Sequence, residues 1–421
     1  MTGQIRVASH GDSVGAGLGR PFPRAESPTG IVHFLTTAAA LTSSWSAVRV
    51  AGVTFTDICL IVGALLALLS SGSRIALLKG WMVLPALLGL VFMARDVVVF
   101  GRPVNGTPDA IEGISPSQML LRIALSTFCI SVLCVVLTKH GRRGVQGIIG
   151  WWLFGIAISA VYALGQSAGV VAAGDLVQLN GTSRFAGLTS HPNALAQTLV
   201  LAIPFALLVP PKPRFGPVVL RILGLALCGA ALYQSGSRAG LLAGFAALLL
   251  CGCIVAKRAH ALRWVLPLVL LATAAAAVYG PRLIAGTRFA SDSGSTASDS
   301  ARVQALSEGW DAFLAHPLGG AGLGVWVGEL APLVLLVSGG VLFLAVYTIF
   351  VLKPIAAMLE HRSDFVVMAC VLSAALVLVL GLLNNGFTER YTFWPALLGY
   401  SLVLVIDSQQ KTKEHADPPL A

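Results

Sequence analysis

The feature that most constrains the fold of this chain is a succession of long apolar stretches separated by short polar ones. A helix needs about 20 apolar residues to cross a hydrocarbon core of roughly 30 Å, and stretches near that length recur along all 421 residues. Only 11% of the residues are charged and 56% are hydrophobic, which excludes a soluble enzyme, a secreted disulfide scaffold and a receptor with a single membrane anchor. The sequence therefore predicts an all-α, polytopic integral membrane protein with about 12 transmembrane helices.

The apolar windows also divide the chain into a membrane domain and two tails. We expect helices near residues 31–48, 53–70, 80–99, 117–138, 147–168, 191–210, 217–235, 239–256, 264–280, 330–352, 365–383 and 393–406. Residues 1–30 are expected to form a disordered cytoplasmic tail and residues 407–421 a second cytoplasmic tail. The polytopic helical membrane domain then comprises residues 31–406.

One predicted outer loop, residues 281–328 between helices 9 and 10, is long enough to have a function of its own. It begins with the polar segment SDSGSTASDS, which is typical of a mobile linker. A helix is predicted over residues 301–315, where Val303, Leu306, Trp310 and Leu314 recur at helical spacing. We expect this amphipathic helix to lie on the membrane surface.

The distribution of charge predicts the orientation of the chain. With the N-terminus inside, 18 of the 28 Lys and Arg residues fall in inside segments and 9 in outside segments. This positive-inside bias predicts a multi-pass plasma membrane protein with both termini in the cytoplasm. The net charge of +10 is then an orientation signal that matches anionic membrane lipids. We expect no nucleic acid partner, because basic grooves interleaved with aromatic residues are absent from the sequence.

Arginine on the outer side is the most informative functional signal. Arg184, Arg238 and Arg302 are predicted to lie there, with Arg288 and Arg390. A charge near membrane depth costs about 2.5–3.5 kcal/mol, so several on one side indicate an anionic ligand. The planar guanidinium suits a phosphate because it donates two parallel hydrogen bonds and stays charged. The alternative is that each arginine extends to the interface or pairs with a local acid.

Two further polar residues, His191 and Asn193, stand at the start of a predicted helix. They are candidates for a helix cap as well as for substrate binding. The seven cysteines all lie in apolar runs, so we expect neither a disulfide framework nor a zinc site.

Three motifs in this order resemble the O-antigen ligase and O-antigen polymerase superfamily of bacterial envelope glycosyltransferases. They are SRFAGLTSHPNALA, SGSRAGLLAG and, in the long loop, SARVQALSEGWDAFLAHPLGGAGLG, and TFTDICL is similar to the family's second span. The resemblance implies a metal-independent enzyme without a cofactor in the inner membrane. Its donor would be an undecaprenyl-diphosphate-linked glycan and its acceptor a glycan or a lipid-linked glycan.

The resemblance also assigns roles to residues. Arg184, Arg238 and Arg302 match the family's arginines and would hold the donor diphosphate. The family's histidine at the start of the following span is missing, and Glu329 stands near its position. Glu329 and Glu389 are therefore the candidate catalytic bases, with Asp311 as a further option. The alternative is a diverged member with an altered acceptor or little activity.

Several other functions remain compatible with the sequence. A transporter or flippase of lipid-linked or anionic solutes would also have polar residues and glycine or proline interruptions in its spans. The absence of an internal repeat and of a chain of mid-membrane acids favours the glycosyltransferase. A third alternative is a non-catalytic envelope assembly protein. The sequence is compatible with both ligase and polymerase activity and carries no signal for the oligomeric state.

Overall fold

The structure is a computed structural model, and it describes residues 28–50, 53–70, 76–102, 114–171, 184–209, 215–258 and 292–416. This part of the chain is mostly helical, as predicted. Its helices are α1 (Pro28–Thr42), α2 (Phe55–Ser70), α4 (Gly80–Val98), α5 (Pro116–Ile123), α6 (Ile130–Leu137), α7 (Gly141–Ser167), α8 (Pro192–Leu208), α9 (Phe215–Gln234), α10 (Arg238–Arg258), α12 (Asp292–Ala315), α13 (Ala331–Glu360), α14 (Phe365–Gly381) and α15 (Trp394–Ala416).

Short elements complete this architecture. A π-helical turn, η1 (Ala124–Cys129), joins α5 to α6, and a 3₁₀ turn, η2 (Thr138–His140), joins α6 to α7. Two strands of two residues, β1 (Arg49–Val50) and β2 (Val53–Thr54), form an antiparallel hairpin between α1 and α2.

Four helical segments are long and apolar enough to cross a membrane: Gly80–Val98, Pro116–Ser167, Arg238–Val255 and Ala331–Glu360. The second of these runs from α5 through α7. Shorter apolar helices of 10–17 residues include Phe55–Ser70 and Pro192–Leu208. The prediction of membrane-capable helices is thus confirmed, whereas the number of twelve spans stays a prediction. The ninth expected helix, residues 264–280, lies outside the described residues.

Several helix boundaries differ from the expected ones. α1 ends at Thr42 because the chain then turns into the β1–β2 hairpin. α15 continues to Ala416, into the segment expected to be a tail. α12 already begins at Asp292, so most of the polar segment expected to be a linker is helical. Residues 1–27 of the expected N-terminal tail lie outside the described part of the chain.

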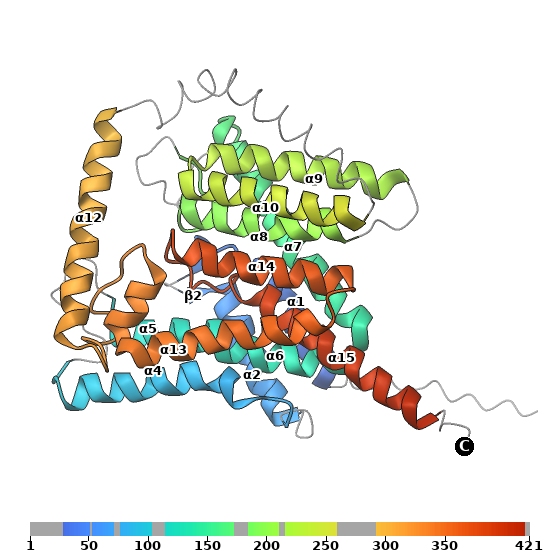
Figure 1. Ribbon diagram of the computed structural model, residues 1–421, viewed down its shortest axis with the longest axis horizontal. Coiled ribbons are helices and arrows are strands. Elements are labelled where there is room, and N and C mark those ends of the chain that lie inside the picture. Colours follow the sequence, from blue (N-terminus) through green and yellow to red (C-terminus); the bar gives the residue numbers. More distant parts are fainter. Residues whose placement is uncertain are drawn as a thin grey trace, which may run out of the picture.

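Most helices run roughly side by side, and α12 stands across one end of them (Figure 1). α8, α9 and α10 form one side of the bundle, while α2 and α4 lie on the other side, with α13 and α14 between. α12 packs on α13, and the C-terminal end of α15 lies at the opposite end of the bundle. α12 therefore lies across the helix ends, and its placement on a membrane surface stays a prediction.

Only part of α12 is covered by the bundle. Gly309 faces the Trp326 ring so closely that a Cβ would come within 2.8 Å of it, and Phe313 is buried. The apolar side chains predicted to form a stripe, among them Val303 and Trp310, are exposed at 67% and 50% and are not covered by the bundle. The glycine is what allows α12 to approach the segment that follows it.

That following segment, residues 316–324, is a glycine-rich turn held by charged side chains of the α4 end. The buried Asp96 accepts a hydrogen bond from the Leu323 amide at 2.6 Å. Arg102 donates to the Ala321 carbonyl at 2.7 Å. The turn is thereby fixed in place ahead of α13.

α13 is interrupted at Gly339 and Gly340, and the latter has a φ of 67° that favours glycine. The break leaves backbone groups without helical partners. The glycine-rich turn supplies one, because the Gly322 amide donates to the Val337 carbonyl at 3.2 Å. The turn and the broken helix therefore stabilise each other.

Candidate functional site

A polar cavity of about 720 Å³ lies at the end of the bundle where α12 crosses. It is enclosed by the starts of α8, α10 and α13, by α12 and by the segment between α14 and α15. The N-terminal end of a helix carries a partial positive charge, so three such ends favour an anion here. The predicted site residues that line the cavity are His191, Asn193, Arg238, Arg302, Glu329 and Glu389.

A smaller hollow of about 70 Å³ adjoins this cavity and shares Asn193, Arg238 and Arg302 with it. Arg184 lines this hollow too. Three arginines from separate parts of the sequence thus meet at one place. We name Arg184, Arg238 and Arg302 the arginine cluster.

Arg184 is positioned by two hydrogen bonds. Its Nε donates to the Ser235 carbonyl at 2.9 Å, and its Nη2 donates to Oδ1 of Asn193 at 2.7 Å. Gly236 lies against it with a φ of 59°, and a Cβ there would come within 3.4 Å of the Arg184 side chain. The SGSR motif therefore contacts Arg184 at the turn that starts α10, where the positive φ of Gly236 favours glycine.

Arg302, on α12, pairs with Glu329. The Nε of Arg302 lies 2.7 Å from Oε2 of Glu329, and its Nη2 donates to Oε1 at 3.2 Å. Both side chains are partly exposed, at 40% and 48%, so this pair contributes about 0–1 kcal/mol to stability. Both oxygens of Glu329 are thus next to a cation.

His191 caps α8, since its Nδ1 accepts a hydrogen bond from the Asn193 amide at 3.1 Å. Burial lowers the pKa of His191, and the positive charges of Arg184 and Arg302 lower it further against the opposing effect of Glu329. A neutral imidazole is what this cap requires, because a protonated Nδ1 cannot accept. The predicted capping role of His191 is confirmed by this bond.

Glu389 differs from Glu329 in its surroundings. Its Oε2 is buried and accepts no hydrogen bond from the described residues, and the same holds for Oδ1 of Asn385 in the same cavity wall. An electrostatic interaction links Glu389 with Arg122 of α5. One carboxylate oxygen of Glu389 is therefore buried in the cavity wall without a hydrogen-bond partner among the described residues.

The residue after Glu389 anchors this wall. Arg390 and Asp57 are both buried, and Nε and Nη2 of Arg390 donate to the two oxygens of Asp57 at 2.7 and 3.1 Å. Asp57 in turn accepts from the Thr54 amide at 3.1 Å. The start of α2 thus fixes the segment that carries Glu389. The expected anion-binding role of the outer arginines does not extend to Arg390, whose guanidinium is engaged by Asp57.

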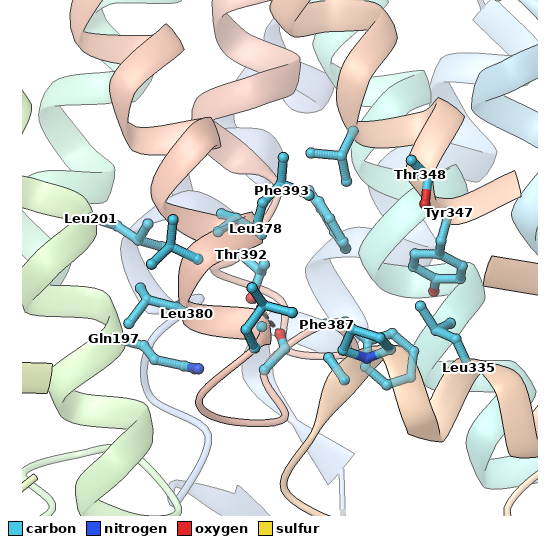
Figure 2. Close-up of a pocket in the computed structure, with 18 of the residues that line it drawn as sticks. Gln197, Leu201, Leu335, Tyr347, Thr348, Leu378, Leu380, Phe387, Thr392 and Phe393 are labelled. Carbon is cyan, nitrogen blue, oxygen red and sulfur yellow. Dashed lines mark hydrogen bonds between the residues drawn. The ribbon is translucent and has the colours of Figure 1, made fainter. Parts of the chain in front are cut away.

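An apolar pocket of about 270 Å³ adjoins the polar cavity and shares Gln197 and Tyr391 with it. The Tyr391 hydroxyl donates to Oε1 of Gln197 at 2.6 Å. Gln197 and Leu201 of α8 lie on one side of this pocket, with Tyr347 and Thr348 of α13 on the other (Figure 2). A polar and an apolar compartment therefore meet at the Gln197–Tyr391 hydrogen bond.

The structure brings together seven of the eight predicted site residues, and the eighth, Arg288, lies outside the described residues. Asp311 is exposed and does not line the cavity. Sequence reasoning missed Gln197, Asn384 and Asn385, which line it. The two adjacent asparagines could have been found from the sequence, because they are polar residues directly after an apolar run.

The described residues contain no group of three or more histidine, cysteine or acidic side chains placed to hold a metal ion. The seven cysteines are free. The charged groups of the cavity are instead the arginine cluster and two carboxylates.

The apolar helices define an integral membrane protein, with a cationic cavity at one end of its bundle. The family model described as O-antigen ligase matches residues 223–334. Over these residues the chain is similar to the O-antigen ligase family, which supports the O-antigen ligase and polymerase superfamily and a role of that type in polysaccharide assembly.

The matched region runs from α9 to the start of α13, so it includes Arg238, Arg302 and Glu329. Arg184, His191 and Glu389 lie outside it and join the site only through the fold. A comparison with curated proteins found no match.

Proposed function

We propose that this protein transfers or polymerises a polyprenyl-diphosphate-linked glycan at the outer face of the bacterial plasma membrane. The observation that carries the proposal is the arginine cluster, in which three guanidinium groups from distant segments line one hollow. That hollow opens on a cavity whose wall holds a carboxylate oxygen without a hydrogen-bond partner among the described residues. Family, charge and shape agree with an anionic, lipid-linked donor.

The arginine cluster is suited to the diphosphate. Breaking the bond between the sugar and its diphosphate leaves the bond electrons on the diphosphate, where negative charge grows. Guanidinium groups already in place stabilise that charge without reorganising. The three helix N-termini around the cavity add positive potential. The donor would therefore be bound and its leaving group activated at the same place.

The apolar pocket is suited to the part of the polyprenyl chain next to the diphosphate. It lies directly beside the polar cavity, and leucine, valine and aromatic side chains line it. The Gln197–Tyr391 hydrogen bond marks the boundary between the two compartments. A molecule with a charged head and an apolar chain fits such a pair of adjoining compartments.

Glu389 is the base that the geometry favours over Glu329. Both oxygens of Glu329 face Arg302, whereas Oε2 of Glu389 has no partner among the described residues. In the proposed step, Oε2 of Glu389 takes the proton of an acceptor hydroxyl. The hydroxyl oxygen then bonds to the anomeric carbon of the donor sugar, and the bond from that carbon to the diphosphate oxygen breaks.

Surface polysaccharide assembly in cells tests this proposal. Cells that lack the wild-type protein would carry Arg184→Ala, Arg238→Ala or Arg302→Ala, each checked for normal abundance in the membrane. Arg143→Ala is the matched control, because Arg143 is exposed near the start of α7 and lines neither cavity. Loss of polymer in the three variants but not in the control is expected. Unchanged polymer in all of them would contradict the proposal.

A further inference from the structure

A separate cavity of about 590 Å³ lies between α7, α8 and α9, next to the start of α14. It shares no lining residue with the arginine-lined cavity or with the apolar pocket beside it. Apart from Arg142 and Gln146, its lining is aliphatic, aromatic or small. We name it the α7–α9 groove.

Small residues on facing helices keep this groove open. A Cβ built on Gly150 of α7 or on Gly224 of α9 would meet no heavy atom within 4 Å. Gly155, on the same helix but outside the groove, is different, because a Cβ there would collide with the Leu41 carbonyl. Close helix packing therefore requires glycine at position 155 but not at positions 150 and 224. At those two positions the glycines leave space that nothing in the described chain fills.

The length of the groove matches one leaflet of a bilayer. Its lining residues on α7 run from Arg142 to Ala157, which corresponds to about 22 Å at 1.5 Å per residue. Half of a bilayer, headgroups included, measures roughly 20–22 Å. The apolar part thus has the reach of one acyl chain, with Arg142 at headgroup level.

Charge at the polar end indicates which headgroup fits. Nη2 of Arg142 lies 2.5 Å from Oδ2 of Asp364, and the Arg142 side chain remains 44% exposed. A guanidinium has five donors, so Arg142 can bind a phosphate while it contacts Asp364. Arg143 follows and is exposed, which adds positive charge beside the groove. Positive charge of this kind attracts anionic lipids.

We propose that the α7–α9 groove binds one anionic glycerophospholipid from the leaflet at this end of the bundle. One acyl chain lies along Gly150 and Ala157, and the phosphate contacts Arg142. The site is distinct from the donor site and does not depend on the proposed transfer activity. Such a bound lipid would fill the space between three helices and tie α9 to α7.

Native mass spectrometry of the purified full-length protein tests the proposal, with phosphatidylglycerol and phosphatidylcholine supplied in equal amounts. Gly150→Leu places a side chain in the groove from a position where a Cβ meets no heavy atom within 4 Å. We expect it to lower the amount of retained phosphatidylglycerol about tenfold. Displacing two methylene groups of the acyl chain from the groove accounts for such a factor. Gly147→Leu is the matched control. Gly147 also has no neighbour within 4 Å of its Cβ position but does not line the groove, so retention there should equal that of the wild type.

Two further variants complete the test. Gly224→Leu fills the groove from α9 and replaces Gly150→Leu should that variant fail to fold, as judged by its thermal midpoint. The double variant Arg142→Gln, Asp364→Asn removes the cation without leaving an unpaired acid, and asparagine keeps the cap that Asp364 gives α14. It should erase the preference for phosphatidylglycerol over phosphatidylcholine. Equal retention in Gly150→Leu, Gly224→Leu and Gly147→Leu, or an unchanged preference in the double variant, would overturn the proposal.

Discussion

Glu329 places its two carboxylate oxygens against one guanidinium: Oε2 lies 2.7 Å from Nε of Arg302, and Oε1 accepts from Nη2 at 3.2 Å. An acid of the chain therefore contacts a member of the arginine cluster. A donor diphosphate would compete with Glu329 for Arg302. This relationship separates the two candidate bases, because both oxygens of Glu329 contact Arg302, whereas Oε2 of Glu389 has no hydrogen-bond partner among the described residues.

Glu329→Gln is predicted to leave transfer largely intact. The neutral amide holds Arg302 less strongly, and an exposed pair of this kind contributes only about 0–1 kcal/mol. Donor binding should stay equal or tighten by up to about fivefold. Glycan transfer by purified protein in liposomes is the measurement. A loss of transfer comparable to that of an arginine variant would show that Glu329 is itself the base.

Glu389→Gln is predicted to lower transfer by about 100-fold or more, the usual effect of removing a general base. Donor binding should change little, because the base acts on the acceptor. Glu308→Gln is the control, since Glu308 is exposed on α12 and lines neither the cavity nor the hollow. Equal activity of both variants would exclude Glu389 as the base.

Asp57→Ala is predicted to destabilise the protein by about 3–5 kcal/mol, because it leaves the buried Arg390 without its partner. Replacing both residues with apolar ones of similar size, Asp57→Leu with Arg390→Met, should restore much of the loss. Thermal unfolding in detergent measures both. If the single variant unfolds at the wild-type temperature, the ion pair does not fix the Glu389 segment.

His191 predicts a pH dependence of stability. Because burial and the two arginines lower its pKa in the folded state, the folded protein binds fewer protons than the unfolded one below about pH 6.5. Stability should therefore fall as the pH drops from about 7 through the ordinary histidine pKa toward the lowered one. His191→Asn keeps a capping side chain that does not titrate.

The thermal midpoint of wild type and His191→Asn at pH 7.5 and pH 5.5 measures this contribution. The difference between the two pH values should be smaller in the variant. An identical difference in both proteins would show that His191 does not titrate in this range.

The helical fold and most of the candidate site follow from local sequence. Apolar length predicts helices, and outer arginines such as Arg184 and Arg302 stand out because charge is costly near a membrane. The arrangement that joins them does not follow from local sequence, since contacts such as that between Asp57 and Arg390 connect residues 333 positions apart. The hydrogen bond between Gln197 and Tyr391 could not be predicted for the same reason. In the sequence, each of them is a single polar residue in or beside an apolar segment.

Other differences have local causes that periodicity cannot reveal. Backbone hydrogen bonds from the glycine-rich turn stabilise the break at Gly339 and Gly340. The local sequence by itself predicts a continuous helix there. The polar start of α12 lacks the apolar spacing that predicts a helix, yet α12 begins at Asp292. Hydrophobic periodicity therefore does not predict the first part of this helix.

Binding of a polyprenyl diphosphate to the purified protein tests the central claim most directly, with the matching monophosphate as the comparison ligand. The wild type should prefer the diphosphate. Arg184→Ala, Arg238→Ala and Arg302→Ala should each weaken diphosphate binding by about 10-fold or more, the equivalent of one charge-assisted contact. Arg143→Ala should bind as the wild type does. Equal affinity of all four variants, or no preference for the diphosphate, would contradict the account.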